Sequence, residues 1–214
     1  MTNTPLILRA QKLGLQMVAS LKKRHFDAYF CPTASQALQQ ALALIPEQDT
    51  VSWGGSASIK EMGLLQALRD RRQPILDRET AQTPEERQRI MRQALTCDTF
   101  LMSANAISQD GQLVNVDGNG NRVAALAYGP KQVIVIAGIN KVVKDLDAAL
   151  VRARTVAAPV NAQRFTENKT PCLVTGACAD CTAPDCICAQ VVITRLCRPA
   201  GRIKVIIVGE TLGY

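Results

Sequence analysis

The segment "QVIVIAG", residues 132–138, constrains the fold most strongly, because it is almost entirely apolar over the length of one strand. A strand with apolar side chains on both faces has to be covered on both faces, which is typical of the centre of a parallel sheet. Turn residues Gly129 and Pro130 precede it, and the helical pattern "DLDAALVRARTVA" follows at 145–157. The segment therefore predicts an α/β fold with helices on both faces of a sheet.

The rest of the chain repeats this alternation of strands and helices, which predicts a mixed, mostly parallel sheet flanked by helices. Helical periodicity or capping residues predict helices near 6–21 and 35–45, and helices that begin at Ser58 and Thr83. Asp110 and Gly111 predict an antiparallel hairpin. We find no linker or repeat and expect one domain over residues 1–214. Further strands are predicted at 26–31, 49–53, 73–77, 99–108, 111–116 and 202–210.

Composition narrows the classes of function. With 214 residues, 47% of them hydrophobic, the chain can form a full core without disulfides. No signal peptide or membrane span is visible, so we expect a cytoplasmic protein with reduced thiols and no membrane partner. The net charge of +7 does not indicate nucleic-acid binding, because aromatic residues make up only 4% of the chain and acidic residues accompany the arginine-rich stretch 69–92. A small anionic ligand fits the charge.

Two glycine-containing stretches are candidate binding loops. In "SWGGSASIKE", residues 52–61, two glycines join a strand to a helix, which fits either a tight turn or a site for a phosphate or carboxylate. The spacing matches neither a P-loop nor a dinucleotide fingerprint. In "NVDGNGNRVAA", residues 115–125, amides and Arg122 are concentrated between two predicted strands. An elaborate turn is the alternative, but we favour a site. Lys141, beyond the next strand, can pair with an anion, and a solvated surface lysine is the alternative. We expect Arg122 and Lys141 to bind an anionic ligand.

Cysteines are concentrated in one loop-like segment. Five of the eight cysteines lie between Cys172 and Cys188, and Cys197 follows. Glycine and proline between them predict a loop that can surround a metal, and only Cys178 and Cys181 have the spacing of a chelating pair. We expect an iron–sulfur cluster as the cofactor, with zinc as the alternative and metal-free thiols or a redox disulfide as the third interpretation. Cys31 and Cys97 are expected in the core.

Together these stretches resemble the lactate-utilisation (LUD) domain family, specifically a largely uncharacterised, cysteine-containing branch. The resemblance rests on "SWGGSASIKEMG", "LVNVDGNGNRVAALAYGPKQVIVIAGINKVV", "AAPVNAQRF" and "TPCLVTGACADCTAPDCIC", and it extends over almost the whole chain. It implies a fold similar to that of sugar-phosphate isomerases and CoA transferases. It also implies a cysteine-rich segment at 170–197, in which Cys186 replaces an arginine expected in relatives.

The resemblance further implies roles for individual residues. For an isomerase- or transferase-like enzyme, we expect catalytic roles for Glu61 or Asp117 as the base and for Lys141 in holding the anion. Ligand-binding roles fall to Gly54, Gly55, Ser56, Asn105, Asn119, Asn121 and Arg122. The implied metal ligands are Cys172, Cys178, Cys181 and Cys188, although Cys186 can take the place of Cys188.

Three functions follow as expectations. The first is an accessory redox protein of 2-hydroxy-acid oxidation that works with an iron–sulfur electron-transfer partner. The second is an isomerase- or CoA-transferase-like enzyme acting on a small phosphorylated or carboxylate substrate, and the third is a non-catalytic ligand-binding subunit with structural zinc. A homodimer is compatible with each of them.

Overall fold

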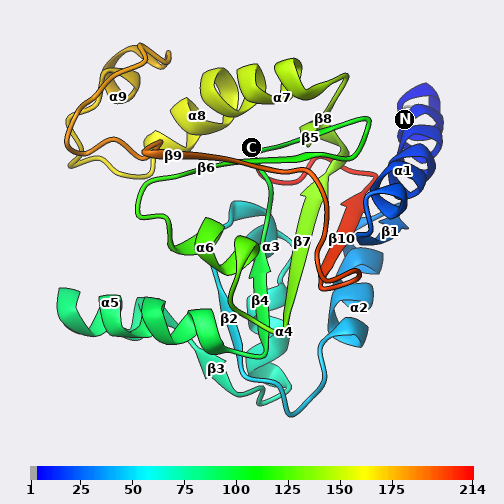
Figure 1. Cartoon of the computed structure of the whole chain (residues 1–214), viewed down its shortest axis with the longest axis horizontal. Coiled ribbons are helices and arrows are strands. Elements are labelled where there is room, and N and C mark those ends of the chain that lie inside the picture. The colour runs from blue at the N-terminus through cyan, green and yellow to red at the C-terminus, as the bar shows by residue number, and fades with distance from the viewer. Residues whose placement is uncertain (1–3) are drawn as a thin grey trace.

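A six-stranded parallel sheet forms the centre of the computed structural model, which describes residues 4–214 (Figure 1). Every pair of neighbouring strands runs in the same direction. The strand order is β1 (Asp27–Cys31), β10 (Ile203–Val208), β7 (Gln132–Gly138), β4 (Thr99–Met102), β2 (Val51–Trp53) and β3 (Ile75–Leu76). The expectation of a mostly parallel α/β sheet with "QVIVIAG" near its centre is confirmed.

Helices connect the strands and cover the sheet. They are α1 (Thr4–Lys23), α2 (Ala34–Leu44), α3 (Ala57–Glu61), α4 (Leu64–Asp70), α5 (Pro84–Gln93), α6 (Asn121–Ala127), α7 (Leu146–Arg152), α8 (Ala158–Ala162) and α9 (Pro171–Thr175). Short 3₁₀ turns lie at Arg78–Thr80, Ala94–Thr96 and Ile139–Lys141, and a π-helical turn, Ala153–Ala157, joins α7 to α8. None of the helices within residues 4–214 combines the length and apolar character that crossing a membrane requires.

The alternation of side chains along β7 explains the two main cores. Val133 and Val135 pack into a cluster that contains the buried face of α1. Ile134 and Ile136 point to the opposite face and pack into a second cluster, which contains buried residues of α2, α3 and α4. Because successive side chains of a strand alternate between faces, an apolar strand supplies both cores at once.

A second, four-stranded sheet lies beyond the carboxyl ends of β4 and β7. Its strand order is β8 (Val142–Val143), β5 (Ala106–Ser108), β6 (Leu113–Asp117) and β9 (Gln190–Thr194). The antiparallel hairpin expected at Asp110-Gly111 is β5–β6 and is confirmed. Helices α7 and α8 lie along this sheet (Figure 1), and their alanines fill a third small core.

Two details differ from the sequence-based expectations. Residues 99–108 form two strands rather than one, because the chain leaves the parallel sheet after Met102 and enters the second sheet at Ala106. Helix α3 is capped by Ser56, whose side chain accepts a hydrogen bond from the N–H of Ile59, and not by Ser58. The helix start at Thr83, with Pro84 in the first helical position, is confirmed.

Candidate functional site

A cleft of about 990 Å³ opens where the two sheets meet, beyond the carboxyl ends of the parallel strands. Both candidate binding loops line it, as expected for an open α/β sheet. Of the residues that the sequence singled out, those lining the cleft are Gly54, Gly55, Ser56, Asn105, Asp117, Asn119, Asn121, Arg122 and Lys141. Glu61 is not among them: its carboxylate accepts a hydrogen bond of 2.7 Å from the N–H of Gly213.

Glycine at 54 lets the two loops touch. A Cβ atom at this position would lie 2.8 Å from Cδ of Arg122, closer than carbon atoms approach without a shift. A Cβ atom at Gly55 would lie 2.8 Å from a terminal nitrogen of Arg78. The absence of side chains at 54 and 55 therefore brings two arginines against this backbone.

Arg122 joins the two sheets through hydrogen bonds to the protein itself. One terminal nitrogen donates to the carbonyl of Ser103 at 3.0 Å and to Oδ1 of Asn115 at 2.6 Å. The other donates to Oδ1 of Asn105 at 3.1 Å and to the carbonyl of Val116 at 2.5 Å. Both terminal nitrogens are thus fully used, which differs from the expectation that Arg122 binds an anion directly and indicates a positioning role.

Asp117 is similarly occupied. Oδ1 accepts from the N–H of Gly120 at 3.2 Å, and Oδ2 accepts from the N–H of Val123 at 3.3 Å. Oδ2 also lies 3.5 Å from Nε of Arg122. The carboxylate therefore caps α6 and pairs with Arg122, so these contacts favour a structural role over the base expected from the sequence. Among the residues described, the side chains of Asn119 and Asn121 form no hydrogen bond and remain available to a ligand.

Lys141 lies at the floor of the cleft and is 3% exposed. Its ammonium nitrogen lies 2.9 Å from Oγ of Ser58 and 3.0 Å from Oγ of Ser103. Burial, followed by the charges of Arg152 and Arg122, lowers the pKa of Lys141 to about 7, while Glu61 partly opposes this shift. The amine can therefore be neutral near physiological pH.

The cleft has a cationic lining. Seven Lys and Arg side chains line it against four Asp and Glu side chains. The basic residues are Lys60, Arg69, Arg78, Arg87, Arg122, Lys141 and Arg164, and the acidic residues are Asp77, Glu79, Asp117 and Asp185. This excess of positive charge favours a small anion.

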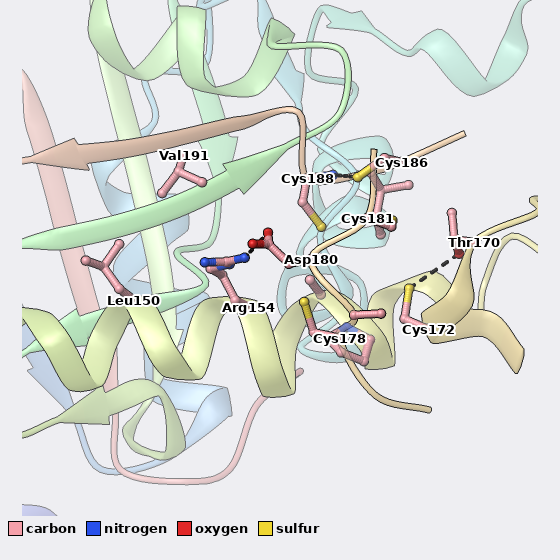
Figure 2. Close-up of a pocket in the computed structure, with 14 residues that line it drawn as sticks. Leu150, Arg154, Thr170, Cys172, Cys178, Asp180, Cys181, Cys186, Cys188 and Val191 are labelled. Carbon is pink, nitrogen blue, oxygen red and sulfur yellow. Dashed lines mark hydrogen bonds and ion pairs between the residues drawn. The ribbon is translucent and has the colours of Figure 1, made fainter. Parts of the chain in front are cut away.

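A second cavity, of about 370 Å³, is lined by five cysteines of the segment after α9. Figure 2 shows these side chains around one space, with Cys172 and Cys178 on one side and Cys181, Cys186 and Cys188 on the other. All five are free thiols. Arg154 forms an ion pair with Asp180 at the cavity wall (Figure 2), which ties the loop to the π-helical turn.

The thiols influence one another. Burial and the neighbouring Cys186, Cys172 and Cys178 raise the pKa of Cys188 to about 12. Several thiolates can therefore share this space only if a cation neutralises them. Within residues 4–214, no three Cys, His, Asp or Glu side chains lie close enough to hold one ion together, so a bound metal centre requires the thiols to turn inward.

A comparison with known protein families identifies the family of this chain. The sequence profile of the LUD domain matches residues 15–208. The chain belongs to the LUD domain family. A solved DUF162 family protein from Deinococcus radiodurans has the same fold as this LUD protein. It is 14% identical with a TM-score of 0.52, and the match covers 93% of this chain and 98% of the other.

Two other solved structures resemble this chain more weakly. They are ribose 5 phosphate isomerase A from Neisseria gonorrhoeae and the eIF2B-beta2-delta2 complex from C. thermophilum. The isomerase is 14% identical with a TM-score of 0.34, over 54% of this LUD protein and 56% of the other chain. The eIF2B chain is 15% identical with a TM-score of 0.42, over 89% and 58% of the two chains. No curated protein matches the sequence significantly.

The cysteine cavity and the cleft of this LUD protein adjoin. Cys186 and Ile187 line both of them. Gly118, in the second candidate binding loop, lies against the backbone of Ile187. The segment that carries the cysteines therefore forms part of the wall of the cleft.

Sequence reasoning missed Ser58 and Ser103 as parts of the site. Ser58 was assigned to a helix cap, and Ser103 was placed inside a continuous strand. The polar sequence Ser103-Ala104-Asn105 within an apolar stretch was the signal that the strand ends there. Nothing in the local sequence around Ser58 indicates its contact with Lys141, because 83 positions separate the two.

Proposed function

We propose that this LUD protein is an accessory redox protein that binds a small organic anion of the 2-hydroxy-acid type beside a thiolate-held iron–sulfur centre. The observation that carries the proposal is the shared wall of the two cavities, formed by Cys186 and Ile187. It would bring an electron-transfer group next to the bound anion.

The cysteine segment supports this proposal through its donor chemistry. The candidate ligands are Cys172, Cys178, Cys181 and Cys188, with Cys186 as a fifth thiol, and soft thiolates suit iron–sulfur clusters or zinc. A single zinc ion sits about 2.3 Å from its sulfur ligands and fills the space between them. A cavity of about 370 Å³ favours a centre of several atoms. Such a cluster, when bound, supplies one-electron transfer.

The cleft residues supply binding and orientation. Asn119 and Asn121 offer amides without other partners within residues 4–214, and the cationic lining attracts a carboxylate. Arg122 holds Asn105 in place across the junction of the two sheets. An iron–sulfur partner protein would accept or donate the electrons.

Metal and sulfide analysis after purification without oxygen tests the proposal. We expect iron and acid-labile sulfide in the wild-type protein and in Cys31→Ala, which removes a buried thiol outside the cavity. We expect the metal content to fall in Cys181→Ser. Zinc without sulfide would instead support the structural-zinc alternative. Protein that holds neither metal, with all five loop thiols free to react, would overturn the assignment.

The enzymatic alternative is favoured by one specific observation, the buried amine of Lys141 at the floor of an anion-attracting cleft. A transferase or isomerase acting on a small phosphorylated or carboxylate substrate can use such a group as a base or nucleophile. Turnover of a panel of such substrates by metal-free protein would support this alternative.

A further inference from the structure

The amine of Lys141 has an unusual set of partners. Buried lysines are normally paired with a carboxylate. Within the described part of the chain, no Asp or Glu oxygen lies within 4.0 Å of this nitrogen, and its hydrogen-bond partners are two serine hydroxyls. The nearby acid Glu61 is instead hydrogen-bonded to the backbone of Gly213. Such a setting suits an amine better than an ammonium ion.

The two serines differ in what they can do. Oγ of Ser58 is fully buried and donates to the carbonyl of Leu212 at 3.2 Å, so it accepts from Lys141 and fixes the position of the amine. Ser103 lines the cleft, as does Lys141; its hydroxyl accepts from the amine at 3.0 Å and donates to the carbonyl of Ala104 at 3.3 Å. Once its O–H bond turns from this carbonyl toward the cleft, Ser103 can exchange a proton between the amine and a bound molecule.

We propose that Lys141 forms an imine with the carbonyl carbon of a small anionic aldehyde or ketone bound in the cleft. The nitrogen lone pair adds to the carbonyl carbon, and Ser103 relays a proton from the nitrogen to the carbonyl oxygen. The C–O bond then breaks, and the oxygen leaves as water that carries both amine protons. No oxidant or metal takes part. Neutral lysines activated by burial and neighbouring cations are known nucleophiles of this type.

The charged groups around the amine agree with this chemistry. Arg122 and Arg152 disfavour a further positive charge there, and Glu61 partly offsets them. The cationic lining of the cleft selects a carbonyl compound that carries a carboxylate or a phosphate. The inference uses the same cleft as the proposed function but is independent of the cysteine segment, so the two can fail separately.

Reductive trapping tests the inference. The protein is incubated with sodium cyanoborohydride and one of three probes: pyruvate, glyceraldehyde 3-phosphate or acetone. Peptide mass spectrometry then locates the adduct. We expect it at Lys141 with one or both anionic probes, which distinguishes carboxylate from phosphate recognition, and much less with acetone. At pH 7.5 a pKa of about 7 gives a neutral fraction several hundredfold above that of an ordinary lysine.

Three variants sharpen this test. Lys144→Arg, an exposed lysine three positions away, should leave trapping unchanged. Lys141→Arg should abolish the adduct, and Ser103→Ala should slow its formation while thermal melting shows an intact fold. Adducts spread evenly over exposed lysines of the wild-type protein, or trapping at Lys141 no faster than at Lys144, would overturn the inference whether or not Lys141→Arg folds.

Discussion

Gly118 and Ile187 are in backbone contact across the boundary between the cleft and the cysteine cavity. A Cβ atom at 118 would lie 3.2 Å from Cα of Ile187 and 3.6 Å from the carbonyl oxygen of Cys186. The absence of a side chain at 118 thus sets how closely the cysteine loop approaches the cleft.

We expect Gly118→Val to push the cysteine loop away from the cleft without altering any thiol. The added side chain meets backbone rather than a flexible side chain, and such overpacking costs about 1–3 kcal/mol. Iodoacetamide labelling of the loop thiols should become faster, and anion binding in the cleft should weaken. Gly176→Ala has open space around its Cβ but a positive φ of 73°, so it serves as a control for loop strain alone. Equal labelling rates in Gly118→Val and wild type would contradict the contact's importance.

Arg122→Ala should destabilise the fold strongly. The change leaves the side chains of Asn105, Asn115 and Asp117 without their charged partner in a largely buried setting, and breaking such a network costs about 3–5 kcal/mol. Chemical denaturation measures the loss. The matched control is Arg89→Ala: this side chain is 62% exposed, lies 3.8 Å from Glu86, and should change stability by at most about 1 kcal/mol. Similar losses in both variants would show that Arg122 does not brace the two sheets.

The low pKa of Lys141 predicts a pH-dependent stability. The folded pKa of about 7 lies below the ordinary lysine value of 10.5, so between these values the unfolded chain binds more protons than the folded one. Stability therefore rises with pH across this window, and the penalty below pH 7 is on the order of 5 kcal/mol. Lys141→Met should reduce the rise measured by denaturation between about pH 6.5 and 8.5. An identical slope in both proteins would show that Lys141 does not titrate in this range.

The eight cysteines should separate into two classes by reactivity. Cys31, Cys97 and Cys197 are buried, and burial raises the pKa of Cys97 to about 12. In metal-free protein, iodoacetamide should modify the partly exposed loop thiols first, with Cys188 slower than Cys178 because its pKa is raised to about 12. Peptide mass spectrometry over time gives the order. Rapid modification of Cys97 in folded protein would contradict the structure.

The fold was largely predictable from the sequence, because the apolar composition of the central strands indicates that both of their faces are buried. Val133 to Ile136 are apolar on both faces and could lie only in the centre of a sheet. Thr83-Pro84 marked a helix start by local chemistry alone. The polar residues Ser103-Ala104-Asn105 mark the end of the first strand within 99–108, but the sequence does not say that the chain then enters a second sheet at Ala106.

The location of the candidate site was predictable from the sequence, but the hydrogen-bond partners of its residues were not. The positions of the two binding loops followed from where strands end, and both line the cleft. The roles of Arg122 and Lys141 depend on partners far along the chain: Lys141 contacts Ser58 and Ser103, which lie 83 and 38 positions away. Sequence spacing carries no information about such contacts, and an arginine that braces a fold looks the same in a sequence as one that binds a ligand.

The position of β10 also affects when the parallel sheet can be completed during protein synthesis. This strand lies between β1 and β7 in the sheet, yet its residues follow those of the other five strands of that sheet in the sequence. Strand β1 pairs with β10 at the edge of the sheet, so on the ribosome it can join the parallel sheet when residues 203–208 have emerged. The cysteine segment leaves the exit tunnel before them, so the nascent chain exposes its thiols before the central sheet is complete.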